Sequence, residues 1–391
     1  MSQYAIVAIG YNRVESMQRL LNSLSKAYYG NDQVTLIISI DNSGTDSVEM
    51  CAKKFQWKYG EKRIVTYPER QGLRKHILHC GEFVKDYDAI AVFEDDVVAA
   101  PSFYSYMKAA VAFYADNMQI AGISLYNHLW NVNANIPFQP SIGPYDAYFL
   151  QFAQSWGQVW MKKQWFEFAQ WYENNCKEME AQDDIPKSVT GWPKTSWLKY
   201  HIKYCVDTDK FFVYPYQALA TCFSDVGEHC QEKDTHLQVA MQMGNKENYI
   251  FPSLTEGVKY DVFFERIFDQ TSSVNGISFS DICVNLYGTK ERYGQKRYLL
   301  SKKNLPYRII ASYGQEIKPH EDNIVVGIEG KDIFLYDLKE KQNNTDGGVN
   351  SVLRDFRYHF RLYGSTKMLI YCVIDKISSR LRKRIKNGEF K

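Results

Sequence analysis

The residues with the clearest potential for chemistry are three consecutive acids, Glu94, Asp95 and Asp96, which follow the apolar run 89–93 (AIAVF). Such a run is typical of a strand buried on both faces of a parallel sheet. Carboxylates crowded at the end of a buried strand repel one another and lose hydration, so a bound cation is expected there. Their hard oxygens favour Mg²⁺ or Mn²⁺, which typically bridge to substrate phosphates. The alternative is a solvated acidic turn.

Three more strand-like runs, 4–9, 34–40 and 64–67, alternate with helical patterns in the first hundred residues. Two helices are predicted by apolar residues that recur every three or four positions. These are Met17, Leu20, Leu21 and Leu24 in the first helix, and Leu73, Ile77, Cys80 and Val84 in the second. The alternation predicts an α/β fold with a parallel sheet and crossover helices.

Polar side chains follow each of these strands, at the edge where ligands bind in open α/β sheets. Asn12 and Arg13 follow the first strand, Asp41 the second and Arg74 the third. Together with the acidic triplet they predict a nucleotide-type pocket. The chain has neither GxGxxG after the first strand nor GxxxxGK[ST] anywhere, so phosphates would need another neutralising group, such as a bound cation.

Composition excludes several classes of protein. The 391 residues have a net charge of +2, from 47 Lys and Arg against 45 Asp and Glu, so nucleic acid is not an expected partner. None of the eight cysteines forms a CxxC pair, which indicates reduced thiols rather than a zinc site. We expect no signal peptide, because the N-terminus leads directly into a strand, and no membrane span, because no apolar run is long enough. A cytoplasmic location is therefore expected.

Residues 91–106 (AVFEDDVVAAPSFYSY) resemble the metal-binding block of the GT-A glycosyltransferases, and look closest to the N-acetylglucosaminyltransferase I type. The similarity extends from near Tyr4 to near Asn245. The resemblance implies a mostly parallel GT-A sheet with flanking helices. It also implies inverting transfer of a sugar from a nucleotide sugar to an acceptor hydroxyl, with Mn²⁺ or Mg²⁺ as cofactor.

The resemblance implies roles for individual residues. Asp96 would coordinate the metal, and His229, in a glycine-containing loop at 224–229 like one in that family, would reach the metal or the diphosphate. A solvated histidine is the alternative. The residues expected at the donor nucleotide or its sugar are Asn12, Arg13, Asp41, Arg74, Glu94 and Asp95. For Glu94 and Asp95, contact with metal-bound water is the alternative.

The catalytic base is the main departure from that family. An inverting transfer needs a carboxylate that accepts the proton of the acceptor hydroxyl. The family has an acid just before a tryptophan, whereas Thr195 and Ser196 precede Trp197 here. Asp184 is the favoured substitute and its neighbour Asp183 the next, with Asp225 a further candidate beside the histidine loop. A shifted alignment or another reaction class would also explain the departure.

Aromatic residues make up 15% of the chain, and six tryptophans lie between 148 and 197. The segment 155–160 (SWGQVW) resembles the loop that closes over the donor sugar in the GT-A fold, and aromatic faces suit sugar rings. The alternative is core packing, which on the helical spacing of Trp160, Phe168 and Trp171 would account for roughly half or more of these aromatics.

The second half has different patterns. Short strand-like runs at 282–286, 307–312, 323–326 and 333–336 predict a small, mainly β appendage. We therefore expect a catalytic domain at 1–250, the appendage at 251–338, and a linker with a basic amphipathic helix at 339–391.

That final helix has an apolar stripe: Ile370, Ile374, Ile377, Leu381 and Ile385. Residues 376–391 contain seven Lys or Arg and one Glu, a net charge of +6, so the rest of the chain has a net charge of −4. A basic amphipathic helix is typical of a membrane-surface anchor. A solvated helix or one that docks into a partner protein is the alternative.

The leading hypothesis is a hexosyl- or N-acetylhexosaminyltransferase at the cytoplasmic face of the membrane. It would use a UDP-sugar and act on a glycan or lipid-linked glycan of bacterial surface polysaccharide. One alternative is a nucleotidyltransferase, which would usually show a glycine-rich basic loop after the first strand. The other is a sugar-binding protein without catalysis, a reading favoured by the missing base.

Overall fold

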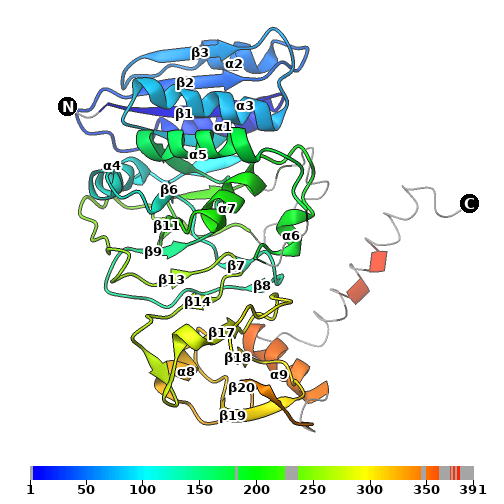
Figure 1. Cartoon of the computed structure of the whole chain (residues 1–391). Coiled ribbons are helices and arrows are strands. Elements are labelled where there is room, and N and C mark those ends of the chain that lie inside the picture. Colours follow the sequence, from blue (N-terminus) through cyan, green and yellow to red (C-terminus); the bar gives the residue numbers. More distant parts are fainter. Residues whose placement is uncertain are drawn as a thin grey trace, which may run out of the picture.

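The fold is taken from a computed structural model, which describes residues 3–180, 184–223, 225, 237–344 and 349–360, together with residues 370, 373, 374, 377 and 378. It has two units, a large α/β unit and a smaller one built on a separate sheet (Figure 1). Figure 1 shows them stacked along the long dimension of the molecule, with the end of the large sheet facing the small unit.

The large unit is organised around a ten-stranded, mostly parallel sheet. Its strands are Tyr4–Gly10 (β1), Thr35–Ile40 (β2), Lys62–Thr66 (β3), Ala89–Glu94 (β4), Ile120–Ser124 (β6), Ala147–Leu150 (β9), Gln158–Met161 (β10), Phe211–Pro215 (β11), Lys259–Tyr260 (β13) and Arg266–Ile267 (β14). Their order is β14-β13-β9-β11-β6-β10-β4-β1-β2-β3. The predicted α/β fold, with its four strands in the first hundred residues, is confirmed.

Helices cover both faces of this sheet. They are Val14–Leu24 (α1), Ser47–Lys54 (α2), Leu73–Gly81 (α3), Phe103–Tyr114 (α4), Lys162–Asn175 (α5), Lys187–Thr190 (α6) and Leu198–Asp207 (α7), with a 3₁₀ turn at Glu82–Asp86. Along β1, Ile6 and Ala8 share a core with α1, α2 and α4, whereas Ala5, Val7 and Ile9 share the other core with α3, α5 and α7. Successive strand residues point to opposite faces, so an uninterrupted apolar strand can fill two cores at once.

The large sheet extends beyond residue 250, where the sequence suggested a domain boundary. Strand β13 pairs in parallel with β9, with Lys259 opposite Phe149, and β14 pairs with β13. These strands have only two residues each, which is too short for a periodic pattern to appear in the sequence.

The smaller unit contains a four-stranded sheet in the order β17-β18-β20-β19. Its strands are Ile282–Asn285 (β17), Tyr298–Ser301 (β18), Tyr307–Tyr313 (β19) and Ile333–Lys341 (β20), and its helices are Asp322–Val326 (α8) and Val349–His359 (α9). Short two-stranded pairs complete the described fold: Val97–Ala99 (β5) with Ala220–Cys222 (β12), Trp130–Asn131 (β7) with Ile136–Pro137 (β8), and Ser273–Val274 (β15) with Ile277–Ser278 (β16). The predicted β appendage is therefore present.

One of its predicted strands, 323–326, is wrong, because this segment is the helix α8. The Asn323 side chain accepts from the backbone N–H groups of Glu316 and Ile317 and donates to the carbonyl of Ile317. Gly327 then ends the helix in the left-handed conformation, with φ of 74°. These contacts fasten Asn323 to the preceding loop, and the segment is helical despite the β preference of its apolar residues.

Buried polar groups join the two units. The Tyr260 hydroxyl donates to Glu321 Oε1 over 2.6 Å, and the backbone N–H of Tyr287 donates to Glu265 Oε1 over 2.7 Å. Both carboxylates are almost fully buried, and burial raises the pKa of each to about 7. The junction is thus packed and hydrogen-bonded rather than a solvated linker.

Among the glycines of the large unit, Gly81 at the end of α3 has the least space for a side chain. A Cβ atom at this position would lie 1.7 Å from the Trp165 ring, which is buried and stacks on Trp160 at 4.2 Å. We expect Gly81→Ala to lower the free energy of unfolding by roughly 1 to 3 kcal/mol or more, because the ring has no space to move into. Urea denaturation measures the change.

Gly244→Ala is the matched control, since no atom lies within 4 Å of the Cβ that it would add. Its stability should equal or slightly exceed that of the wild type. Equal stability of the Gly81 and Gly244 variants would contradict the steric explanation.

Candidate active site

The first four strands end at one edge of the sheet. They are parallel neighbours, with Ile9 of β1 opposite Glu94 of β4 and Gly10 opposite Ile40 of β2. Ile40 is in turn opposite Thr66 of β3. Because the registers align these ends, the segments that follow them lie side by side. The edge predicted from sequence is therefore formed as expected.

The acidic triplet follows β4 at this edge. The Arg13 guanidinium, at the start of α1, forms an ion pair with Asp95, and its Nη2 lies 3.4 Å from Asp96 Oδ2. Asp95 is buried, whereas the Asp96 side chain is 27% exposed. Arg13 thus lies against the triplet; the sequence predicted it only to be near the donor nucleotide.

The triplet has more negative charge than its described neighbours compensate. Burial raises the pKa of Asp95 to about 6 even though Arg13 opposes the shift. Burial and the charges of Asp96 and Asp95 raise the pKa of Glu94 well above its usual range, and burial raises that of Asp96 as well. Three carboxylates and one guanidinium have a net negative charge when all are ionised, so a further positive charge would stabilise the cluster.

The donor atoms fit a divalent cation at Asp96. Its carboxylate offers hard oxygens, is partly exposed, and lies in an environment that disfavours uncompensated negative charge. Within the described ranges no group of three His, Cys, Asp or Glu side chains surrounds a potential metal position. His229, the other expected ligand, lies outside the described residues.

Asp41, after β2, organises the neighbouring loop. Its Oδ1 accepts from the backbone N–H groups of Asn42 and Gln71, over 2.8 and 2.7 Å, and its Oδ2 accepts from that of Gly72 over 2.9 Å. Gly72 has φ of 74°, and α3 begins at the next residue. Asp41 therefore fixes the entry into α3, the helix that contains Arg74. Contact with a base stays a prediction.

The other two residues expected at the nucleotide differ in their surroundings. Asn12 is exposed at the end of β1. Arg74 donates from Nη1 to the Tyr200 hydroxyl over 3.2 Å and lies over the Tyr200 ring. Tyr200 belongs to α7, so the guanidinium is held between two helices that are far apart in sequence. This contact has no signal in the sequence pattern.

Trp197, just before α7, reaches the acidic triplet. Polar interaction with its side chain lowers the pKa of Glu94, against the larger effect of burial. Trp197 is 4% exposed and its ring lies 5.8 Å from that of Trp160. The sequence singled out this tryptophan only for the missing acid before it, whereas the structure places it in contact with the first acid of the triplet.

Of the three candidate bases, Asp225 lies near the triplet. Its Oδ2 accepts from Ser16 Oγ over 2.7 Å and forms an ion pair with Arg19, both in α1. Burial alone would raise its pKa, but these donors hold it below the usual range. A carboxylate with a lowered pKa is a weak base. Its bonds to Ser16 and Arg19 instead make it a clamp, a side chain that holds α1 to the segment after β12.

The other two candidates lie on the segment before α6. Asp184 is exposed, two residues before Pro186, and Asp183 lies outside the described residues. The contacts of the described residues therefore do not select a base.

The model of the family described as glycosyl transferase family 2 matches residues 5–161, the segment that contains β1–β4, Arg13, Asp41 and the acidic triplet. This segment of the chain is therefore similar to glycosyl transferase family 2. Its GT-A fold, predicted from the sequence, is confirmed. No curated protein matches the chain.

Solved structures resemble the chain at low identity. They include the mannosyltransferase PcManGT from Pyrobaculum calidifontis in complex with GDP-Man and Mn²⁺, at 13% identity, covering 48% of this chain and 50% of that one, with a TM-score of 0.32. S. aureus TarS 1–349 in complex with UDP-GlcNAc is 14% identical, with 58% and 60% coverage and a TM-score of 0.37. GalNAc-T7 with UDP, GalNAc and Mn²⁺ is 12% identical, with 55% and 42% coverage and a TM-score of 0.38. The matched part thus spans about half the length of these proteins.

We expect Asp225→Asn to lower the free energy of unfolding by roughly 1 to 2 kcal/mol, because it removes a charged acceptor from the partly buried Arg19. Urea denaturation measures this. Asp116→Asn is the control, since Asp116 is 89% exposed and its ion pair with Lys163 should contribute little. If the two variants lose the same stability, Asp225 does not act as a clamp.

Proposed function

We propose that the chain transfers a sugar from a nucleotide sugar, with a UDP-sugar the expected donor, to the hydroxyl of an acceptor. The observation that supports this most is the position of the acidic triplet. It lies at the end of β4, within the segment that the family 2 model matches, beside Arg13 and on the same sheet edge as Asp41. The narrower resemblance to the N-acetylglucosaminyltransferase I type belongs to this proposal, as does the choice between a hexosyl and an N-acetylhexosaminyl donor.

The roles follow from the charges on this edge. Asp96 would hold Mn²⁺ or Mg²⁺, which supplies positive charge to the diphosphate that leaves when the sugar is transferred. Arg13 and Arg74 would contact the phosphates or ribose, and Asp41 would position the loop on which the base rests. Glu94 and Asp95 would contact the ribose or sugar. In the proposed inverting mechanism a carboxylate accepts the proton of the acceptor hydroxyl, and Asp184 remains the favoured candidate because Asp225 is engaged by Arg19.

The acceptor is proposed to be a glycan or lipid-linked glycan of bacterial surface polysaccharide, met at the inner face of the membrane. Support comes from the C-terminal segment, where Ile370, Val373, Ile374 and Ile377 are helical and each more than half exposed. Spacings of three, one and three residues place them on one helix face. An exposed apolar stripe in a strongly basic segment suits an anionic membrane surface. Among the described helices, none has the length and apolar content to cross a membrane.

Asp96→Ala should abolish transfer while leaving the fold intact, because the cation would lose its principal ligand. The primary measurement is UDP release from a panel of UDP-sugars with Mn²⁺. The second is thermal stabilisation by Mn²⁺ and UDP together, which reports binding to the folded chain independently of turnover. The variant should lose both, whereas Asp116→Ala should keep both.

Full activity in Asp96→Ala would refute the assignment of the metal. Stabilisation by a nucleotide sugar without UDP release under any acceptor condition would favour a sugar-binding protein. Release of pyrophosphate from a nucleoside triphosphate would favour a nucleotidyltransferase.

Deleting residues 366–391 should move the protein from the membrane fraction to the supernatant. Co-sedimentation with vesicles of anionic and of zwitterionic lipid measures this directly. The double variant Ile374→Ser with Ile377→Ser keeps all basic residues and should also lose most binding, because it interrupts the apolar stripe. Unchanged sedimentation of the deleted chain would rule out the anchor.

A further inference from the structure

An aromatic patch lies where the two units meet at the end of α9. Its members are Trp130 of β7, in the large unit, and Phe356 and Phe360 of the small unit. The ring centroids of Trp130 and Phe360 are 6.3 Å apart, and those of Phe356 and Phe360 are 4.9 Å apart. Phe356 is 43% exposed, and the other two residues are partly exposed. Three neighbouring aromatic rings thus reach the surface from both units.

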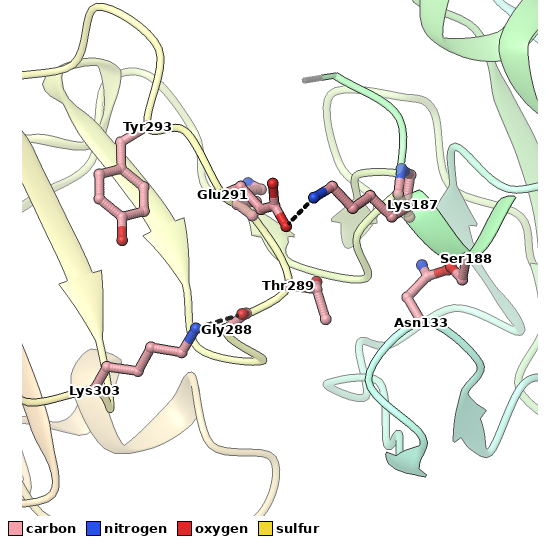
Figure 2. A pocket seen from close by; sticks show the side chains of 10 residues that line it. Asn133, Lys187, Ser188, Gly288, Thr289, Glu291, Tyr293 and Lys303 are labelled. Atoms are coloured by element: carbon pink, nitrogen blue, oxygen red, sulfur yellow. Dashed lines mark hydrogen bonds and ion pairs between the residues drawn. The ribbon is translucent and has the colours of Figure 1, made fainter. Parts of the chain in front are cut away.

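The hairpin of β7 and β8 holds Trp130 in place. The next residue, Asn131, is buried, and its Oδ1 accepts from the backbone N–H of Asn133 over 2.9 Å. Asn133 donates from Nδ2 to the carbonyl of Val262 over 3.0 Å. Its Oδ1 accepts from Ser188 Oγ of α6 over 2.6 Å, and Figure 2 shows these two side chains together. The hairpin is therefore bonded to two other segments of the large unit, so Trp130 is presented from a rigid support.

Helix α9 holds the two phenylalanines of the patch on its outer face. They are four residues apart, and the backbone N–H of Phe360 donates to the carbonyl of Phe356 over 2.8 Å, which continues the helical turn. The opposite face is occupied, because Asp355 forms an ion pair with Lys302 and the Tyr358 hydroxyl donates to a backbone carbonyl before α8 over 2.7 Å. These contacts hold the helix with Phe356 at the surface, where its ring is accessible to a partner outside the chain.

The patch lies on the side of the molecule where the strands of the candidate active site end. Strand β6 runs parallel to β4, because both pair antiparallel with β10 between them. Ser124 of β6 and Val92 of β4 both lie opposite Gln158, so the two strands end at the same edge, and Trp130 follows six residues after Ser124. In Figure 1 the N-terminus, from which β1 starts, lies on one side, and β7, α6 and α9 lie on the other. The patch and the acidic triplet therefore share the side of the carboxyl ends.

The part of the chain around and after the patch suits an anionic membrane surface. Arg357, between the two phenylalanines, is exposed, and residues 376–391 have a net charge of +6. Four apolar residues that follow the patch are each more than half exposed: Ile370, Val373, Ile374 and Ile377. Aromatic and aliphatic side chains insert at the boundary between lipid headgroups and acyl chains, and basic residues beside them attract anionic lipid. A lipid surface can therefore cover the patch and neutralise the charge at the same time.

We propose that the aromatic patch is a second contact with an anionic membrane surface, in addition to the C-terminal segment. Two contacts fix an orientation that a single one leaves free, and these two turn the carboxyl edge of the large sheet toward the lipid. The candidate active site would then open toward the membrane. The link to a lipid-linked acceptor rests on the proposed function, whereas binding of the patch to lipid does not.

The test uses the full chain and co-sedimentation with vesicles of mixed phosphatidylcholine and phosphatidylglycerol. The double variant Phe356→Ser with Phe360→Ser should weaken binding about tenfold, because two apolar rings no longer pass from water into lipid. Phe356→Ser alone changes an exposed position and should weaken binding severalfold, so the result does not depend on the packing of Phe360. Phe356→Trp should keep the binding of the wild type, since tryptophan also suits the membrane boundary.

Phe113 is the matched control, because it is 53% exposed on α4, which Figure 1 shows on the opposite side of the molecule from α9. Phe113→Ser removes the same ring and should leave binding unchanged. The tryptophan of Phe356→Trp should be quenched by bromine-labelled lipid beyond the quenching of the wild type, whereas Phe113→Trp should add none. Equal weakening by Phe113→Ser and Phe356→Ser, or no extra quenching in Phe356→Trp, would overturn the proposal.

Two further measurements separate this proposal from others. Sedimentation velocity without lipid should give the same mass for the wild type and for the double variant. A larger wild type that the double variant reduces to a monomer would make the patch an interface between copies of the chain and overturn the membrane contact. Asp96→Ala should bind vesicles as the wild type does, so failure of the proposed transfer reaction and failure of this proposal are distinguishable.

Discussion

Negative charge at the end of β4 is the constraint on which the arrangement of the site depends. The strand is buried on both faces and ends at Glu94, which Asp95 and Asp96 follow directly. Arg13 pairs with Asp95, Trp197 lies beside Glu94, and the backbone carbonyl of Asp96 accepts from Phe223 N–H where β5 pairs with β12. Each of these partners comes from a different part of the chain. Contacts with the triplet therefore hold α1, the start of α7 and the segment after β12 close together.

This dependence explains which features of the site were predictable. Residues that follow consecutive parallel strands reach the same edge because of the register, which the apolar pattern of each strand largely determines. Arg13, Asp41 and the triplet could thus be placed from sequence alone. The contacts of Trp197 with Glu94, of Tyr200 with Arg74 and of Arg19 with Asp225 could not. They join residues more than a hundred positions apart, and no local spacing encodes such pairings.

The fold shows the same division between local and long-range information. Periodic apolar residues predicted α1 and α3, whereas the two-residue strands β13 and β14 exist only because they pair with β9 and with each other. The segment 322–326 forms the helix α8 rather than a strand, and its Asn323 side chain bonds to the backbone of Ile317, a contact that the apolar composition of the segment does not reveal.

Most of the tryptophans predicted near the sugar are part of the hydrophobic core, and one of them also lies beside the acidic triplet. Trp160, Trp165 and Trp197 are buried together between the sheet and the helices α5 and α7, whereas Trp156 is only partly buried. Because Trp197 belongs to this cluster and also lies beside Glu94, the core and the triplet share a rigid element.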